Sequence, residues 1–214
     1  MKSVTSPRDQ LLTGLSALNL GIPESAVDML LCYCALLEKW NRVYNLTAIR
    51  EKARLVSHHL LDCLAVVPYL EGGSMVDVGS GAGLPGIPVA VARPSTQVVL
   101  LESNHKKGAF MNQAVAELGL ENVQVVISRA EEWRPTKQSD MAISRAFSDL
   151  AGFVEAAARL VKPGGLLLAM KGLYPHEELT QVPPTASLSS VIPLNVPGLR
   201  ATRHLVRLRA NIER

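Results

Sequence analysis

Apolar residues recur at one spacing in the first third of the chain and at another spacing in the rest. Between Val27 and Tyr44, and again between Val56 and Val67, they stand three or four positions apart. This spacing gathers apolar side chains on one face of a helix, and the proline that follows ends the second pattern. We therefore expect residues 1–72 to form a helical extension.

Beyond Gly72-Gly73, short runs rich in valine and isoleucine alternate with stretches of helical spacing. The expected strands are 75–78, 97–101, 123–127, 141–144 and 165–171, with helical patterns over 105–119 and 149–160. Strands that alternate with helices predict a parallel sheet covered on both faces. Near the end, RHLVRLR (203–209) alternates strictly, which predicts a further strand with arginines on one face. The proline-rich stretch 175–197 before it is expected to be mostly loop.

Composition restricts the class of protein. The chain has 214 residues, of which 48% are hydrophobic and 19% charged, so it is long and apolar enough to bury a full core. No stretch approaches the roughly 20 apolar residues of a membrane helix, and the polar start lacks the core of a signal peptide. The three cysteines have no zinc spacing, and neither they nor the histidines form a cluster. We expect a cytoplasmic protein with reduced core thiols, no metal and no membrane contact.

The net charge of +3 excludes a generally basic nucleic-acid coat, but the basic residues are unevenly distributed. Residues 200–214 contain five arginines and one acid, and residues 38–54 contain five basic residues and two acids. Local basic patches are what a selective RNA partner requires.

The stretch MVDVGSGAGLPGIPVAV (75–91) holds four glycines within eight residues. The expected strand ends at Asp77-Val78, and a helix is expected to begin near Pro85 or Pro88, because proline is favourable in the first turn. Glycine permits positive φ and leaves room for a ligand on the backbone. Ligands of open α/β sheets bind beyond the carboxyl ends of strands, where this loop lies. A tight turn without a ligand is the alternative.

Two cofactors fit this loop. Read from Gly81, GAGLPG matches the dinucleotide fingerprint, although Gly79 already occupies the position directly after the strand. Read from Asp77, the pattern D-x-G-x-G-x-G resembles motif I of class I methyltransferases that use S-adenosylmethionine (SAM). In that superfamily an acidic residue at the end of the second strand, here Glu102, accepts hydrogen bonds from the ribose hydroxyls, a role that suits a carboxylate. LVKPGG (160–165) also resembles the turn that precedes the superfamily's fifth strand.

Two motifs for particular methyl acceptors are absent. The N/D-P-P-Y/F/W motif of enzymes that methylate exocyclic amino groups is replaced by SRAFSDL (144–150), and all three cysteines precede the glycine loop. A covalent mechanism through a cysteine is therefore not expected. A guanine N7 acceptor needs neither device, because its in-plane lone pair carries no proton and attacks the methyl group once it is held in line.

Six segments together resemble one family. They are WNRVYNLTAIR (40–50), HLLDCL (59–64), the glycine loop, SRAFSDL, MKG (170–172) and RHLVRLR. The chain is identified as a member of the bacterial 16S rRNA guanine-N7 methyltransferase family known as RsmG or glucose-inhibited division protein B. The resemblance implies a Rossmann-like α/β fold with a mostly parallel seven-stranded sheet, helices on both faces and an N-terminal helical extension. It divides the chain into that extension (1–72) and a SAM-binding core (73–214).

The resemblance also implies SAM as cofactor, S-adenosylhomocysteine as product, and 16S rRNA within the 30S subunit as substrate. We expect a monomer, although the sequence does not itself determine the oligomeric state. The expected cofactor-binding residues are Asp77, Gly79, Gly81, Gly83, Leu84, Glu102, Ala130, Glu131 and Arg145. The expected catalytic residues are Arg145 and Asn45, and the expected RNA-binding residues are Lys171, Arg203, Arg207 and Arg209.

Each candidate has an ordinary structural alternative. Arg145 is expected to contact the guanine or a phosphate, or else to form a surface ion pair with Glu131 or Asp149. Asn45 is expected to shape the acceptor pocket, or else to end a helix in the left-handed conformation. Trp40 is expected in the core rather than in a stacking platform. For the chain as a whole, the alternatives are methyl transfer to a small molecule or protein, a non-catalytic RNA-binding assembly factor, and a nicotinamide oxidoreductase.

Overall fold

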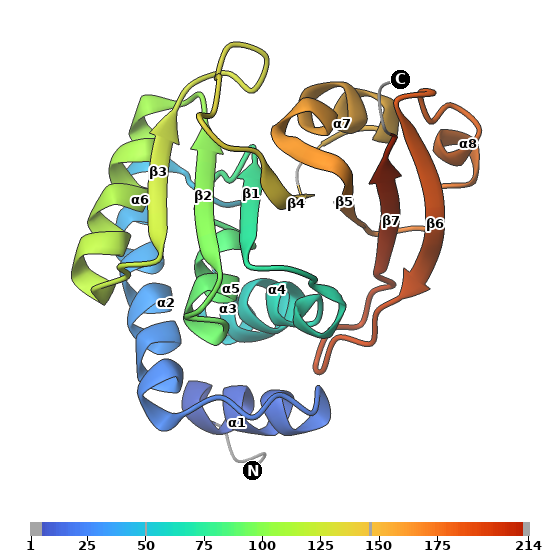
Figure 1. Ribbon diagram of the computed structural model, residues 1–214. Coiled ribbons are helices and arrows are strands. Elements are labelled where there is room, and N and C mark those ends of the chain that lie inside the picture. The colour runs from blue at the N-terminus through green and yellow to red at the C-terminus, as the bar shows by residue number, and fades with distance from the viewer. Residues whose placement is uncertain (1–5, 50, 146, 212–214) are drawn as a thin grey trace.

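The computed structural model describes residues 6–49, 51–145 and 147–211, and a seven-stranded sheet forms the centre of these residues (Figure 1). The strands are β1 (Ser74–Val78), β2 (Gln97–Glu102), β3 (Val123–Ile127), β4 (Ser139–Ser144), β5 (Val161–Lys171), β6 (Ala186–Pro193) and β7 (His204–Ala210). Their order is β3-β2-β1-β4-β5-β7-β6; β7 pairs antiparallel with both β5 and β6, and the other neighbouring strands pair in parallel. The predicted mostly parallel, seven-stranded sheet is confirmed.

Helices precede the sheet and connect its strands. They are α1 (Pro7–Ala17), α2 (Glu24–Tyr44), α3 (Lys52–Leu55), the π-helical turn η1 (Val56–Leu61), α4 (Asp62–Leu64), η2 (Val67–Tyr69), α5 (Gly86–Ala92), α6 (His105–Leu118), α7 (Leu150–Ala157), η3 (Ala158–Leu160) and α8 (His176–Leu179). Local sequence sets several boundaries. The side chains of Ser6, Asn104 and Asp149 accept backbone N–H groups at the starts of α1, α6 and α7.

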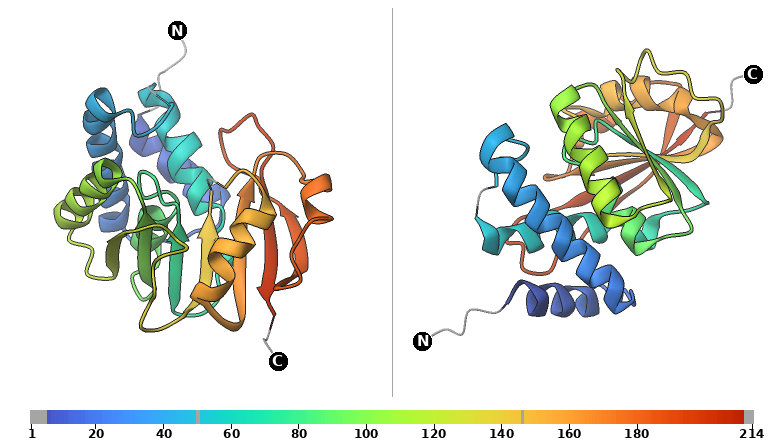
Figure 2. Two further views of the ribbon diagram at one scale, coloured as in Figure 1. Left: turned by 90° about the horizontal axis from the view of Figure 1, so that it is seen from above. Right: turned by 90° about the vertical axis from the view of Figure 1, so that its left-hand side faces the viewer.

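The helices cover the two faces of the sheet unequally (Figure 2). The extension, α5 and α6 lie on one face, whereas α7 lies on the other. Alternation along β5 serves both layers: Leu166 and Leu168 belong to the hydrophobic cluster of the extension, and Leu167 and Ala169 belong to the cluster of α7. Because successive strand residues point to opposite faces, a central strand with two covered faces reads as a continuous apolar run.

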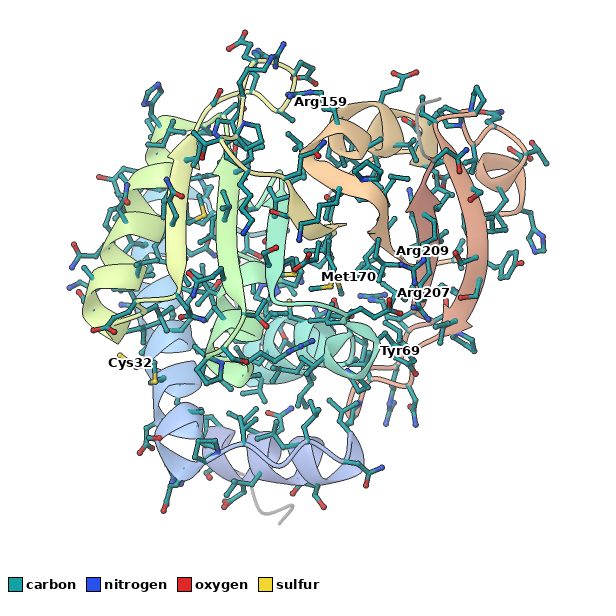
Figure 3. The ribbon with its side chains drawn as sticks, in the orientation of Figure 1. Cys32, Tyr69, Arg159, Met170, Arg207 and Arg209 are labelled. Atoms are coloured by element: carbon teal, nitrogen blue, oxygen red, sulfur yellow. The ribbon has the colours of Figure 1, made fainter. Side chains whose placement is uncertain are left out.

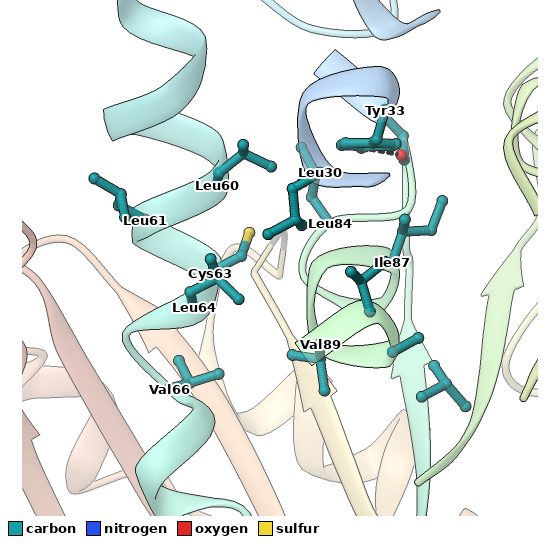
Figure 4. Packing of buried hydrophobic residues seen from close by; sticks show 14 of the residues in the cluster. Leu30, Tyr33, Leu60, Leu61, Cys63, Leu64, Val66, Leu84, Ile87 and Val89 are labelled. Atoms are coloured by element: carbon teal, nitrogen blue, oxygen red, sulfur yellow. Dashed lines mark hydrogen bonds between the residues drawn. The ribbon is translucent and has the colours of Figure 1, made fainter. Parts of the chain in front are cut away.

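The extension packs directly on the glycine-loop helix. Figure 4 shows Leu30 and Tyr33 of α2, together with residues of η1 and α4, around Leu84 and Ile87. The Trp40 ring lies 5.6 Å from that of Phe110 on α6, which confirms the predicted core position of Trp40. One continuous hydrophobic cluster crosses residue 72, so the division of the chain at that residue stays a prediction.

All three cysteines are free, but the prediction that they lie in the core is wrong for one of them. Cys32 is exposed (Figure 3), whereas Cys34, two positions later on α2, is buried, as expected for two faces of a helix. Burial raises the pKa of Cys34 to about 12, so its thiol is protonated at neutral pH.

Strand β6 lies in the stretch 175–197, which is expected from its prolines to be mostly loop, and the sequence does not predict this strand. Its sequence ASLSSVIP does not alternate cleanly, and it pairs only with β7 at the edge of the sheet. An edge strand tolerates polar residues and a terminal proline because one side has no ladder to complete.

A buried hydrogen bond joins the extension to the glycine loop. The Tyr33 hydroxyl donates to the Ala82 carbonyl at 2.6 Å. Replacing Tyr33 by phenylalanine leaves that carbonyl buried without a partner, so we expect the free energy of unfolding to fall by about 1–3 kcal/mol. Urea unfolding measures the change. Tyr69→Phe is the control, because the Tyr69 hydroxyl makes no hydrogen bond among the described residues. Equal stability of the two variants would contradict the prediction.

Candidate functional site

The glycine loop lies at the carboxyl ends of β1 and β2. The N–H groups of Gly79 and Ser80 both donate to the Leu101 carbonyl of β2, at 2.9 and 3.1 Å. The Ser80 hydroxyl donates to the Asp77 carbonyl at 2.7 Å. The loop is thereby fastened to both strands before α5 begins at Gly86, which matches the predicted start near Pro85.

The four glycines fall into two pairs with different roles. Gly79 and Gly81 have φ of +71° and +60°, and a Cβ added to either would meet no atom closer than 4.0 Å. At Gly83 an added Cβ would lie 2.4 Å from Ile87 Cδ1, and at Gly86 it would lie 2.2 Å from Leu100 Cδ2. The first pair leaves open backbone that a ligand can approach, whereas the second pair is required for packing.

Two buried carboxylates accept hydrogen bonds from backbone N–H groups of this loop and of the first residue of α5. Asp77 Oδ2 accepts the Gly86 N–H at 2.8 Å, and Glu102 Oε2 accepts the Gly81 N–H at 2.9 Å. Glu102 Oε1 accepts the Asn104 N–H, also at 2.9 Å. Because a carboxylate has about four acceptor sites, Glu102 keeps capacity for ligand hydroxyls.

Asp77 is the more deeply buried of the two carboxylates. Its Oδ1 atom is buried and has no hydrogen-bond partner among the described residues. Burial raises the pKa of Asp77 to about 7, although the Gly86 N–H opposes the shift. An unpaired buried acceptor beside open backbone fits a site that a ligand completes.

The other expected cofactor residues lie at the same sheet edge. Leu84 is buried in the extension's cluster (Figure 4), so its side chain serves packing. Ala130 and Glu131 follow β3; Ala130 is half-buried and its carbonyl accepts from Arg159, while Glu131 is exposed. The alternative ion pair of Arg145 with Glu131 or Asp149 is not formed, because Arg145 turns toward the extension and pairs with Asp62.

A cavity of about 400 Å³ opens beside the loop, between the extension and the ends of β4 and β5. We call it the arginine cavity. Its lining residues are Thr47, Ala48, Ile49, His58, His59, Asp62, Arg145, Met170, Lys171, Gly172 and Arg203. Arg145 directly follows β4, whose Ser144 hydroxyl donates to the Val78 carbonyl at 2.8 Å. This bond places the arginine cavity next to the start of the glycine loop.

Asp62 connects the two arginines of the cavity. Its Oδ1 accepts Nε–H of Arg203 at 2.8 Å, and its Oδ2 lies 3.4 Å from Nη1 of Arg145. The Asp62 side chain is 3% exposed. Asp62 is not among the site residues expected from the sequence. The available signal is HLLDCL, in which a histidine and an aspartate interrupt an apolar helical pattern.

His59 forms a neutral part of the cavity wall. Its Nε2 lies 2.9 Å from Thr47 Oγ1, and its Nδ1 lies 3.4 Å from Arg145 Nη1. Burial, with Arg145 as the second cause, lowers the pKa of His59 to about 4. The imidazole is therefore uncharged at neutral pH.

Asn45 ends α2 in the left-handed conformation, with φ of 50° and ψ of 51°, as the capping alternative predicts. It is exposed and does not line the arginine cavity. The amide that shapes the neighbouring loop is that of Asn41, which accepts the Thr47 N–H at 2.8 Å and donates to the Ile49 carbonyl at 3.2 Å. A catalytic role for Asn45 stays a prediction.

The other expected RNA-binding cations have partners within the protein. Lys171 Nζ lies 2.7 Å from Glu178 and donates to the carbonyls of Phe147 and Ser148. Arg207 and Arg209 follow each other along β7 (Figure 3), and both pair with Glu71 at the end of the extension. The arginine face of β7 therefore lies on the side of the sheet that the extension covers.

Comparison with known proteins decides the family. A sequence model described as rRNA small subunit methyltransferase G matches residues 27–206. The chain belongs to this family. It is 54% identical over 211 residues to the ribosomal RNA small subunit methyltransferase G of Nitrosospira multiformis, with 95% of this chain and 98% of that protein covered. It is also 54% identical over 200 residues to the protein of the same name from Chromobacterium violaceum, with 93% and 96% covered.

Solved structures support the fold of this family member. The O-methyltransferase TomG from Streptomyces achromogenes, solved in complex with SAM, superposes with a TM-score of 0.59 at 15% identity, covering 92% of this chain and 94% of that one. Within the described part of the chain, no helix has the length and apolarity needed to cross a membrane, and no three His, Cys, Asp or Glu side chains gather as metal ligands.

The neutral, buried His59 makes stability depend on pH. The unfolded histidine titrates near 6.5 and the folded one near 4, so the unfolded state binds the proton first and stability falls as the pH drops below 6.5. Between pH 7 and pH 5 we expect the wild type to lose about 2 kcal/mol more than His59→Gln, which cannot titrate. Denaturant unfolding at the two pH values measures this difference. The opposite contribution of Asp77 cancels in the comparison, and equal losses would contradict the prediction.

Proposed function

We propose that this chain is a SAM-dependent methyltransferase that transfers a methyl group to N7 of a guanine in the 16S rRNA of the small ribosomal subunit. The observation that carries the proposal is a bare backbone loop, held by two carboxylates, beside a cavity lined by arginines. Membership of the rRNA small subunit methyltransferase G family supports the same activity.

SAM is proposed to lie against Gly79 and Gly81, where added Cβ atoms would project into open space. The free acceptor sites of Glu102 suit the two ribose hydroxyls, and Ala130-Glu131 at the neighbouring strand end is proposed to border the adenine. When bound, SAM supplies a methyl group on a positively charged sulfur, and the product is S-adenosylhomocysteine. Ligands of open α/β sheets generally bind beyond the carboxyl ends of the strands, and TomG, a protein of the same fold, was solved in complex with SAM.

The cavity chemistry suits an acceptor that has no proton to lose. The His59 imidazole has a pKa of about 4, far below the value near 7 that a general base at neutral pH needs. The Asp62 carboxylate is occupied by two arginines. The lone pair of guanine N7 attacks the methyl carbon directly, so the protein has to orient the base, exclude water and hold the reacting atoms at roughly 3–3.5 Å.

The partner is proposed to be RNA rather than a free metabolite. N7 lies on the outer edge of the base, which an unpaired guanine turned out of its stack presents. Arg145, Arg203 and Lys171, which all line the cavity, are proposed to meet the nucleotide there, with Arg207 and Arg209 along the adjoining surface. A monomer acting on the 30S subunit in the cytoplasm completes the proposal.

Substitution at one open glycine should weaken cofactor binding specifically. Gly79→Ala and Gly119→Ala both place a side chain at positive φ, +71° and +61°, with no atom closer than 4.0 Å. Each is expected to cost about 1–2 kcal/mol of stability through backbone strain. Only Gly79→Ala is expected to weaken SAM binding, by at least about tenfold, because its methyl group occupies the space of the ligand. Calorimetric titration measures the SAM affinity of both variants, and equal affinities would count against this binding site.

Methyl transfer tests the function itself. Purified protein is incubated with SAM labelled in its methyl group and with either 30S subunits or naked 16S rRNA. We expect label in the RNA, identified by mass spectrometry as 7-methylguanosine at one position, and a strong reduction with Gly79→Ala. SAM binding without transfer to any acceptor would favour a non-catalytic assembly factor. Label in a protein or a metabolite alone would favour another methyl acceptor.

A further inference from the structure

A carboxylate sealed from solvent joins two partly exposed arginines on the wall of the arginine cavity. The side chain of Asp62 is 3% exposed, whereas those of Arg145 and Arg203 are 26% and 25% exposed. All three line the cavity. The carboxylate thus lies behind the guanidinium groups, and the open part of each guanidinium belongs to the cavity wall.

Fold stability does not explain this arrangement. Removing a carboxylate from water costs several kcal/mol, and well-packed apolar side chains of similar volume would serve the fold as well or better. The neighbours of Asp62 along the chain, Leu60, Leu61 and Cys63, are all buried in the extension's cluster. A charged cluster kept in such a place is better explained by what it presents to the cavity.

The cluster presents N–H donors with a net charge of +1. All polar contacts of the Arg145 guanidinium with the described residues use Nη1. Arg203 donates from Nε to Asp62 and from Nη1 to the Thr202 carbonyl. Among the described residues, Nε and Nη2 of Arg145 and Nη2 of Arg203 have no partner. Donors of this kind match the acceptor atoms of a guanine nucleotide, O6 of the base and the phosphate oxygens.

Fixing the arginines has a specific chemical advantage for attack by N7. A freely rotating arginine commonly binds O6 and N7 of guanine together. That contact would occupy the lone pair that has to form the new N–C bond while the electrons of the C–S bond return to sulfur. The contacts with Asp62 restrict the rotation of each guanidinium toward N7. In addition, the carboxylate offsets one of the two positive charges near a base that becomes positively charged on methylation.

We propose that the arginine cavity receives the acceptor guanine nucleotide and that Asp62 is the positioning residue that aligns Arg145 and Arg203 on it. This inference rests on the proposed function and adds to it the place of the acceptor and the residue that organises it. Asp62 acts through the arginines and does not touch the reacting atoms.

The test compares Asp62→Asn and Asp62→Glu with the wild type, using 30S subunits and labelled SAM. Asp140→Asn is the control: Asp140 also pairs with a cation, Lys162, and accepts backbone N–H groups, but it lies at the amino end of β4, whereas the arginine cavity lies at the carboxyl ends of β4 and β5. Calorimetry gives the number of SAM sites and the SAM affinity of each protein, and rates are expressed per SAM site so that unfolded protein does not contribute.

For Asp62→Asn we expect unchanged SAM affinity, an unchanged or lower KM for 30S subunits, and a kcat that falls by about ten- to a hundredfold, since small misplacement of reacting groups has effects of this size. Asp62→Glu is expected to restore part of kcat. Asp140→Asn is expected to lower stability and leave kcat per SAM site unchanged. If Asp62→Asn does not fold, Arg203→Lys is measured instead, which keeps the charge, loses the planar contact with Asp62 and should also lower kcat.

Two results would overturn the inference, and they differ. If the wild type methylates 30S subunits and the Asp62 or Arg203 variants keep the wild-type kcat per SAM site, only the role of Asp62 is wrong. If the wild type binds SAM and methylates no RNA, the proposed function fails and the acceptor role of the cavity fails with it.

Discussion

The glycine loop is held in place by two carboxylates, and the rest of the site depends on that attachment. Asp77 at the end of β1 accepts the N–H that opens α5, and Glu102 at the end of β2 accepts the N–H of Gly81. Without side chains, a loop of this kind has many accessible backbone conformations, and folding has to restrict them. The two buried carboxylates, together with Tyr33 from the extension, restrict the loop to one conformation. In that conformation the backbone at Gly79 and Gly81 stays open to a ligand.

Much of the fold could be predicted because it depends on local patterns. Apolar runs of strand length predicted β1 to β5, although β5 begins at Val161 and so includes residues expected to form the turn before it. Three- and four-residue spacing predicted α2 and the helical segments around η1. Strand β6 could not be predicted this way, because an edge strand is defined by its partner rather than by its own apolar pattern. The periodicity of the sequence does not predict this strand, and only the family resemblance implied a sheet of seven strands.

The candidate site was less predictable, for a physical reason. Positions fixed by backbone geometry, such as Gly79, Gly81 and Asn45, have a sequence signature because few residues adopt positive φ. Ion pairs between distant segments have none. The alternation of RHLVRLR predicts an arginine face, but only the packed structure shows that the arginines of this face form ion pairs with Glu71 and Asp62. The sequence shows which residues are charged, but tertiary packing determines which of them form ion pairs with each other.

The extension therefore does more than cover the sheet. It supplies Thr47, His59 and Asp62 to the arginine cavity, while the core supplies Arg145 and Arg203. Each of these core cations is paired by a residue that precedes the glycine loop, so the cavity exists only when the two parts of the chain are packed together. For an acceptor that needs no general base, rate depends chiefly on orientation. Orientation in turn requires rigid cavity walls. Two arginines paired with the buried Asp62, which lies in a helix packed on a continuous hydrophobic cluster, form a more rigid wall than unpaired surface side chains would.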